Sequence, residues 1–253
     1  MVGIYFSGTG NTKFCLERFV TKADPEAKVI SISDPGVSKE IKENECIVFG
    51  YPIYFSNLPK IVRDFIDRYK ELFRNKKIYI IATMGLFSGD GAGCSARLFK
   101  KYGAVIIGGL HIKMPDCIGD KKALKKSLKD NKELVKKAED KIDQAAKRWK
   151  DGRLTQEGIG NAYHLAGLFG QRLWFYNKTK KYSDALKINS NLCVGCGKCS
   201  RECPMKNIHI KENKAISEGK CTMCYRCVSY CPKQAITLLG NHVYEQCRIE
   251  RYL

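Results

Sequence analysis

Eight cysteines in the last quarter of the chain carry the clearest chemical signal. They form two runs with one spacing, Cys-x-x-Cys-x-x-Cys-x-x-x-Cys-Pro, and the second run follows the first by 28 residues. The runs are Cys193, Cys196, Cys199 and Cys203, then Cys221, Cys224, Cys227 and Cys231. Three thiolates at this spacing can wrap a loop around one cube of iron and sulfide, each binding a different iron. The repeat therefore predicts two [4Fe-4S] clusters.

Other uses of clustered cysteines fit this spacing less well. Structural zinc takes two pairs of ligands separated by a loop, often with histidine. Disulfides suit small secreted chains, and no signal peptide is predicted, because the chain opens with a strand-like run. Five scattered cysteines have no partner pattern: Cys15, Cys46, Cys94, Cys117 and Cys247. Free thiols beside clusters predict a cytoplasmic protein in a reducing compartment, with an anaerobe as its source.

The cysteine spacing resembles that of bacterial two-cluster ferredoxins, in which the fourth cysteine of each run ligates the other cluster. The resemblance implies crossed ligation. The first cluster would be held by Cys193, Cys196, Cys199 and Cys231. The second would be held by Cys221, Cys224, Cys227 and Cys203.

A second candidate site lies at the start of the chain, where an apolar strand runs into a loop of small residues and then a helix. Backbone N–H groups at such a helix start can bind phosphate. A P-loop requires Gly-Lys-Ser/Thr, and a dinucleotide fingerprint requires a third glycine where Lys13 stands. The loop Ser7-Gly8-Thr9-Gly10-Asn11-Thr12 resembles instead the phosphate loop of flavodoxin. A purely structural glycine turn is the alternative.

Strand-like and helix-like segments alternate over the first 150 residues. The expected strands are 2–6, 28–32, 46–51, 78–82 and 104–110. The expected helices include one opened by Pro59, with an apolar face reaching Leu72, one that ends near Tyr102, and a stretch over 120–149 with a break at Asn131. This alternation predicts an α/β fold with a five-stranded, doubly wound parallel sheet.

Ligands of such sheets bind outside the carboxyl ends of the strands, where three loops meet: 7–12, 51–58 and 83–91. They resemble the phosphate loop and the two flavin-flanking loops of flavodoxin, and the aromatic residues of the second suit an isoalloxazine ring. The FMN contacts that this implies are Ser7, Thr9, Gly10, Asn11, Thr12, Pro52, Ile53, Tyr54, Phe55, Met84, Gly85, Phe87, Ser88, Gly89 and Asp90. Core packing is the alternative for Tyr51 and Phe55, and a turn or helix N-cap for Asp90.

As a whole, the chain resembles the fused flavodoxin–ferredoxin proteins of anaerobic bacteria and archaea. The resemblance implies a flavodoxin-like FMN-binding domain over 1–150 and a small α+β ferredoxin-like domain with two [4Fe-4S] clusters over 187–240. Residues 151–186 would form a partly helical connector, and 241–253 a tail without a motif. Within the connector, a helix over 162–176 is expected to bury Leu165, Phe169, Leu173 and Trp174 between the domains.

This membership implies electron transfer between the clusters and FMN within one chain, as a carrier or relay between partner enzymes. The alternative is an iron–sulfur flavoprotein reductase, an FMN-dependent oxidoreductase of ferredoxin type, in which loop 85–93 and Cys94 shape a pocket for a small acceptor. A carrier should leave the flavin face open, and a reductase should wall a cavity over it. A third hypothesis is a sensor or assembly module with structural clusters.

Charge bears on the partners. The formal net charge is +19, and two clusters and an FMN phosphate would leave a surplus of about +13. Solvated lysine faces explain most of it, and acidic redox proteins are the expected donor and acceptor. No nucleic-acid module is predicted, and no apolar run approaches the length that spans a bilayer. An interfacial position on a membrane is the alternative for the helix over 162–176.

Overall fold

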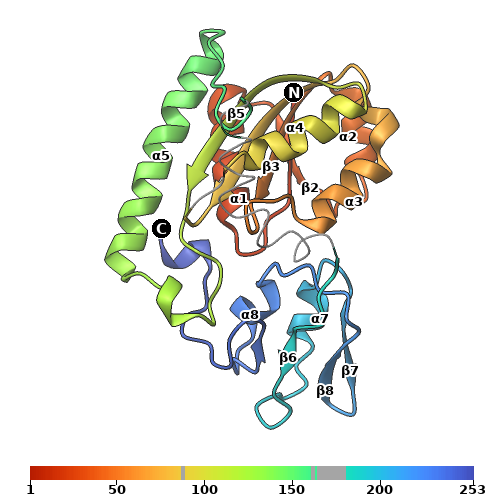
Figure 1. The fold of residues 1–253 in the computed structure, drawn as a ribbon, viewed down its shortest axis with the longest axis vertical. Coiled ribbons are helices and arrows are strands. Elements are labelled where there is room, and N and C mark those ends of the chain that lie inside the picture. Colours follow the sequence, from red (N-terminus) through yellow and green to blue (C-terminus); the bar gives the residue numbers. More distant parts are fainter. Residues whose placement is uncertain (87–88, 161–162, 164–180) are drawn as a thin grey trace.

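The computed structural model describes residues 1–86, 89–160, 163 and 181–253. In its first half, helices surround one five-stranded sheet (Figure 1). The strands are β1 (Val2–Tyr5), β2 (Lys28–Ser31), β3 (Cys46–Pro52), β4 (Lys77–Met84) and β5 (Val105–Lys113). All neighbours are parallel, in the order β2-β1-β3-β4-β5. The predicted doubly wound sheet is confirmed, and its topological switch point lies between β1 and β3.

Helices cover both faces of the sheet. On one face lie α1 (Asn11–Ala23) and α5 (Leu128–Lys150), and on the other α2 (Val37–Glu43), α3 (Lys60–Arg68) and α4 (Gly91–Lys101), with the 3₁₀ turn η1 (Lys70–Phe73). A second 3₁₀ turn, η2 (Lys122–Leu124), lies between β5 and α5. The predicted break at Asn131 is wrong. The Ser127 side chain caps α5 by accepting a hydrogen bond from Asp130 N at 3.1 Å, and Asn131 is buried in the first turn. The helix therefore starts later than predicted and continues through Asn131.

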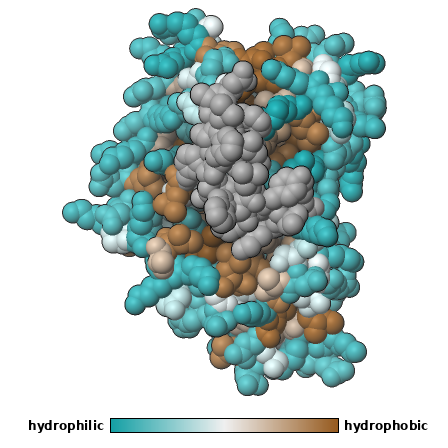
Figure 2. Space-filling model, viewed as in Figure 1, coloured by the Kyte–Doolittle hydropathy of each residue, from teal (hydrophilic) through white to brown (hydrophobic). Residues whose placement is uncertain are grey.

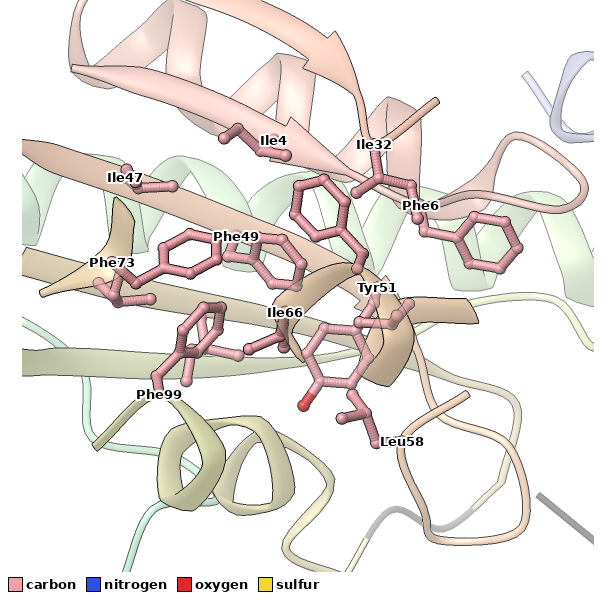
Figure 3. Packing of buried hydrophobic residues seen from close by; sticks show 14 of the residues in the cluster. Ile4, Phe6, Ile32, Ile47, Phe49, Tyr51, Leu58, Ile66, Phe73 and Phe99 are labelled. Carbon is pink, nitrogen blue, oxygen red and sulfur yellow. The ribbon is translucent and has the colours of Figure 1, made fainter. Parts of the chain in front are cut away.

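The strands are apolar along their length because both of their faces are covered. On the face of α3 and α4, Phe99 lies edge-on to Phe49 and Phe73, with ring centroids 5.1 and 4.9 Å apart (Figure 3). On the other face, Phe19 stacks on Tyr79 at 5.2 Å. This packing makes the sheet a rigid base for the loops at its carboxyl edge.

The second half lies beside that edge (Figure 1). It consists of β6 (Lys187–Ile188) paired with β9 (Ile236–Thr237), the hairpin β7 (Ile208–Lys211) and β8 (Lys214–Ser217), and the short helices α7 (Lys198–Glu202) and α8 (Arg226–Tyr230). The tail ends in a 3₁₀ turn, η4 (Ile249–Arg251), and returns to the first half, where Ile249 and Tyr252 join the core under α1 and α5. The predicted helix over 162–176 lies outside the described residues, apart from the exposed Tyr163.

Within the ranges given above, no helix combines the length and the apolar character that crossing a bilayer requires.

Candidate functional site

A cavity of about 240 Å³ opens at the carboxyl edge of the sheet. The loops after β1, β3 and β4 form three of its walls, as their place in the alternating pattern predicts. Ten of the predicted contacts line it: Ser7, Thr9, Asn11, Thr12, Pro52, Ile53, Tyr54, Phe55, Met84 and Gly85. Gly10, Gly89 and Asp90 are not in the lining, and Phe87 and Ser88 lie outside the described residues.

The loop after β1 presents backbone donors to the cavity. Gly10 has a φ of 96°, which turns the chain into α1, and its N–H donates to Ser7 Oγ at 3.1 Å. No side chain caps α1, so its first N–H groups have no partner within the helix. The hydroxyls of Thr12 and Thr83 are 2.7 Å apart, which ties the loop to β4. Such a helix start favours an anion.

The loop after β3 is a tight turn with an aromatic tip. Tyr54 and Asn57 exchange two backbone hydrogen bonds, of 3.1 and 2.9 Å. The two residues between them, Phe55 and Ser56, have φ values of 50° and 54°. Both are thus left-handed without being glycine, as in a type I′ turn, at a cost of roughly 1–2 kcal/mol each. This strained turn sets Tyr54 and Phe55 into the cavity wall. Tyr51 points instead into the core, where its hydroxyl lies within hydrogen-bond distance of the Ser95 hydroxyl and the Gly91 carbonyl.

The loop after β4 contributes through Met84, Gly85 and Leu86. Asp90 has another role at its far end. Its carboxylate is fully buried and pairs with Arg97 at 2.6 Å, beneath the first turn of α4. Although Asp90 occupies the N-cap position, it makes no side-chain capping bond. Cys94 is likewise outside the cavity lining.

Two further walls were missed from the sequence. One is the loop after β5, and the other comes from the cysteine-rich half. Their lining residues are Met114, Pro115, Asp116, Cys117, Ile118 and Leu124 for the first wall, and Met223, Cys224, Tyr225 and Leu239 for the second. Gly8, Thr83 and Leu86 also line the cavity, from the predicted loops 7–12 and 83–91. The β5 loop could have been found, since it also follows a parallel strand. No motif in the sequence around 223–225 or 239 indicates that these residues lie next to a loop of the sheet.

Arg226 and Asp120 hold the two halves together at this cavity. The Arg226 guanidinium donates to the Ser7 carbonyl at 2.6 Å and to that of Gly8 at 3.4 Å. A Cβ at Gly8 would collide with the Cys224 carbonyl, so only glycine allows this approach. Asp120 is 1% exposed, and it accepts bonds from Leu238 N, Leu239 N and Gly240 N at 2.6–3.0 Å and from the Tyr225 hydroxyl at 2.9 Å.

The eight motif cysteines surround two small cavities. One is lined by Cys193, Cys196, Cys199 and Cys231, which we call site 1. The other is lined by Cys203, Cys221, Cys224 and Cys227, which we call site 2. Each site thus takes three cysteines from one run and the fourth from the other run. Cys224 also lines the cavity at the sheet edge.

Comparison with protein families now identifies both halves. The flavodoxin domain family matches residues 3–110, and the 4Fe-4S dicluster domain family matches residues 185–234.

The chain is a flavodoxin–ferredoxin fusion.

Its cofactors are accordingly FMN and two [4Fe-4S] clusters, and its role is redox electron transfer. Among solved structures, it is similar to two-electron reduced Megasphaera elsdenii flavodoxin, with 21% identity over 58% of this chain and 99% of that one and a TM-score of 0.44. Oxidised flavodoxin 2 from Bacillus cereus shows 18% identity over 60% and 97%, with a TM-score of 0.42. The comparison with curated proteins finds no match.

The flavodoxin-domain cavity fits FMN by its donor set. The start of α1 suits a phosphate, and the turn at Tyr54 and Phe55 supplies an aromatic wall. Asn11 donates through Nδ2 to Pro115 O at 2.7 Å, while its Oδ1 is buried and has no protein partner in the described part of the chain. An acceptor in this position suits a hydroxyl donor of a bound ligand.

The ferredoxin domain fits clusters by its sulfur environments. Backbone N–H groups approach two sulfurs at each site, all at 3.3–3.4 Å. They are Ala215 N to Cys193 and Ala235 N to Cys231 at site 1, and Met223 N to Cys221 and Asn207 N to Cys203 at site 2. Such bonds stabilise metal-bound thiolates and adjust the cluster potential. Burial raises the pKa of the Cys221 thiol to about 12, and it also raises the pKa values of Cys224 and Cys227. A bound metal is what deprotonates such thiols.

Each four-cysteine site surrounds its cavity without converging on a point. Among the residues that the structure describes, no three Cys, His, Asp or Glu side chains converge as they would on a single metal ion. A cube differs, because each of its four thiolates binds a different iron. The linings of sites 1 and 2 therefore suit a cube better than a lone ion.

Proposed function

We propose that the chain is an intramolecular electron relay in which site 2 lies next to FMN and site 1 lies farther away. When bound, the clusters pass single electrons, and FMN takes one or two. The observation that carries the proposal is that Cys224 lines both the site 2 cavity and the flavin cavity. The neighbouring Met223 and Tyr225 also belong to both the cysteine motif and the flavin wall. The proposal includes the eight cysteines of sites 1 and 2 as cluster ligands and the ten predicted residues that line the cavity as FMN contacts.

The chain's own residues fix the relative pose of the two domains. Arg226, between the site 2 ligands Cys224 and Cys227, donates to two phosphate-loop carbonyls. From the other domain, Asp120 binds the backbone at 238–240 and the Tyr225 hydroxyl. Cys224 itself packs in the core of the flavodoxin half. Covalent fusion and these contacts replace a bimolecular encounter with an intramolecular one.

The origin of the cavity walls helps to choose between a relay and the alternative, a reductase with a pocket for a small acceptor. The described wall residues beyond the three flavin loops come from the ferredoxin domain and from the loop after β5. Because the wall over the flavin includes the site 2 ligand Cys224, we take it as a path for electrons and not as a pocket for a small acceptor. The proposal includes the division of the chain into a flavodoxin domain (1–150), a connector (151–186), a ferredoxin domain (187–240) and a tail (241–253).

Two cysteine variants test the relay. Cys227→Ala removes a ligand of site 2, and Cys231→Ala removes a ligand of site 1, so each should lower the iron content from about eight to about four per chain. After rapid mixing with a small viologen radical, flavin reduction should slow about 100-fold or more in Cys227→Ala, because electron transfer falls steeply with distance. In Cys231→Ala it should stay within about threefold of the wild type.

Protein concentration supplies the control. An intramolecular relay gives a flavin reduction rate that does not change when the protein is diluted at constant excess of the radical. A rate that rises in proportion to protein concentration, or equal rates in wild type and Cys227→Ala, would show that the relay is wrong.

A further inference from the structure

The two four-cysteine sites differ most in their access to solvent. At site 2, Cys224 and Cys227 are buried. Site 1 also has two buried cysteines, Cys199 and Cys231, but its Cys196 is exposed, as no cysteine of site 2 is. We propose that the surface around site 1 is the docking surface for a small acidic one-electron protein, which exchanges electrons with the chain there. We call this surface the site 1 face and define it by Leu192, Val194, Cys196, Ile210, Lys214 and Lys233. The proposal rests on the relay and names its partner.

Apolar side chains form the centre of the site 1 face. Val194 is 57% exposed, Leu192 is 49% exposed, and Ile210 is 38% exposed. Val194 and Ile210 both line the site 1 cavity together with Cys196. The exposed Ile216 does not belong to this face, because it pairs with His209 on the opposite side of the β7–β8 hairpin from Ile210 and Ala215. Large apolar groups left in water around a redox centre indicate a protein contact.

Cations surround this apolar centre. Lys214 Nζ donates to the Cys193 carbonyl at 2.7 Å, and Arg201 Nη1 donates to the Cys196 carbonyl at 3.4 Å, so both charges are held beside the cysteine loop. Lys233 lines the site 1 cavity and also an adjoining groove of about 420 Å³ that contains Lys187 and His242. In Figure 2, apolar and hydrophilic residues are interspersed over the cluster-binding half at the lower end of the view.

Carboxylates are few on this side. Among the described residues, the linings of the site 1 cavity and of the groove contain no Asp or Glu. The hairpin turn adds Glu212, which is exposed. Over 187–240 the sequence has nine Lys or Arg against three Asp or Glu. A partner with an acidic rim and an apolar centre therefore complements the face, and opposite charges would also speed the encounter.

The exchange itself needs no other reactant. The partner loses one electron and site 1 gains it, with no bond formed or broken and no proton moved. The reverse holds if the partner is the acceptor. The flavin cavity is a poorer entry point for a protein, since Met223, Cys224 and Tyr225 already cover it from the ferredoxin side.

A charge-reversal pair tests the face. Lys187→Glu/Lys233→Glu, the site 1 pair, changes Lys233 of the site 1 face and Lys187 of the adjoining groove, both of which are exposed. Lys136→Glu/Lys147→Glu changes two exposed lysines of α5 and shifts the net charge equally. The probe is a small acidic [2Fe-2S] ferredoxin, and the measurement is its Kd by titration calorimetry at low ionic strength with both proteins oxidised. We expect the site 1 pair to weaken binding about tenfold or more, and the α5 pair less than about twofold.

Repeating the titrations at high salt tests whether the difference in Kd between the two pairs is electrostatic. Near 1 M salt the Debye length falls to about 3 Å, so the difference between the two pairs should shrink. Equal weakening by the two pairs, or tight binding that ignores both, would overturn the docking surface. The iron content of each pair, measured alongside, shows that the clusters are retained. The relay is judged separately, by the dilution test, so either proposal can fail alone.

Discussion

Sites 1 and 2 are built from one motif, and each has two buried cysteines, yet their surroundings differ at one corresponding pair. Positions 28 residues apart correspond, and the exposed Cys196 of site 1 corresponds to the buried Cys224 of site 2. Likewise Gly197 corresponds to Tyr225, and Lys198 to Arg226. The cysteines are conserved between the copies because cluster ligation requires them. The residues between the cysteines differ, and they decide which copy faces the flavin domain and which faces solvent.

Tyr225 shows how this difference is produced. Gly197 and Tyr225 both precede a short helix with left-handed backbone, at φ values of 72° and 59°. Glycine adopts this conformation freely, whereas for tyrosine it costs roughly 1–2 kcal/mol. In return the Tyr225 hydroxyl donates to Asp120 Oδ1 at 2.9 Å across the domain boundary. The second copy thus accepts backbone strain and gains an anchor that the first copy lacks.

The largest expected effect comes from removing the Asp120 carboxylate, which anchors the second copy of the motif to the flavodoxin domain. Burial raises its pKa, but three backbone N–H groups and the Tyr225 hydroxyl outweigh burial and hold the pKa below its usual value. Asp120→Asn removes the charge that these donors share, and we expect the free energy of unfolding of the ferredoxin domain to fall by about 3 kcal/mol. Urea unfolding followed by visible cluster absorbance measures this.

The control for that substitution is Asp140→Asn, which changes an exposed carboxylate of α5. Its effect should stay within about 0.5 kcal/mol. Similar losses in the two variants would mean that Asp120 is not what secures site 2 against the flavodoxin domain.

Substitutions of the corresponding cations Arg226 and Lys198 should have an effect of intermediate size, on FMN binding. Arg226→Met removes the donors to Ser7 O and Gly8 O and should loosen the phosphate loop, weakening FMN binding about tenfold, or about 1.4 kcal/mol. Lys198 lies over the Tyr230 ring, 5.5 Å from its centroid. Lys198→Met should therefore leave the FMN dissociation constant within about twofold. Flavin fluorescence on titration reports both constants, and equal shifts would contradict the assignment of site 2 as the flavin-side cluster.

The smallest expected effect is a loss of stability at low pH, which we expect in the flavodoxin sheet and not at either cluster site. Burial lowers the pKa of His111, on β5, to about 4, whereas an unfolded histidine titrates near 6.5. The unfolded chain thus takes up the proton first, so stability is full above about pH 6.5 and is lost as pH falls toward about pH 4. Among the described residues, the linings of sites 1 and 2 contain no histidine or carboxylate.

Between about pH 8 and about pH 6, this difference amounts to about 1 kcal/mol of unfolding free energy. His111 Nε2 accepts from Ala92 N at 3.3 Å, and His111→Phe removes the titrating ring. The variant should lack that share of the pH dependence in urea titrations followed by far-ultraviolet circular dichroism. An unchanged pH dependence in the variant would exclude His111 as the source.

Local patterns determined much of this protein. The cysteine spacing predicts three of the four sulfurs of each site, because a cube imposes its ligand spacing on one short loop, and the resemblance to two-cluster ferredoxins implies the fourth. Alternating apolar strands and helices predict the sheet, and the order of elements places loops 7–12, 51–58 and 83–91 at one edge. The helix ends were predicted less well. The apolar stripe reaching Leu72 continues past the end of α3 at Arg68 into a 3₁₀ turn, and α5 starts at Leu128, later than predicted.

Only the tertiary structure decided how the two domains meet. Arg226 reaches Ser7 across 219 positions of the sequence, and Asp120 reaches Leu238 across 118. The tail, which has no motif, contributes Ile249 N as a donor to Thr9 O at 3.0 Å. Contacts of this kind depend on which surfaces of two folded domains become neighbours, and no periodicity within either domain encodes that choice. For this reason the sequence predicts both clusters and the flavin loops, while the choice of the flavin-side cluster appears only in three dimensions.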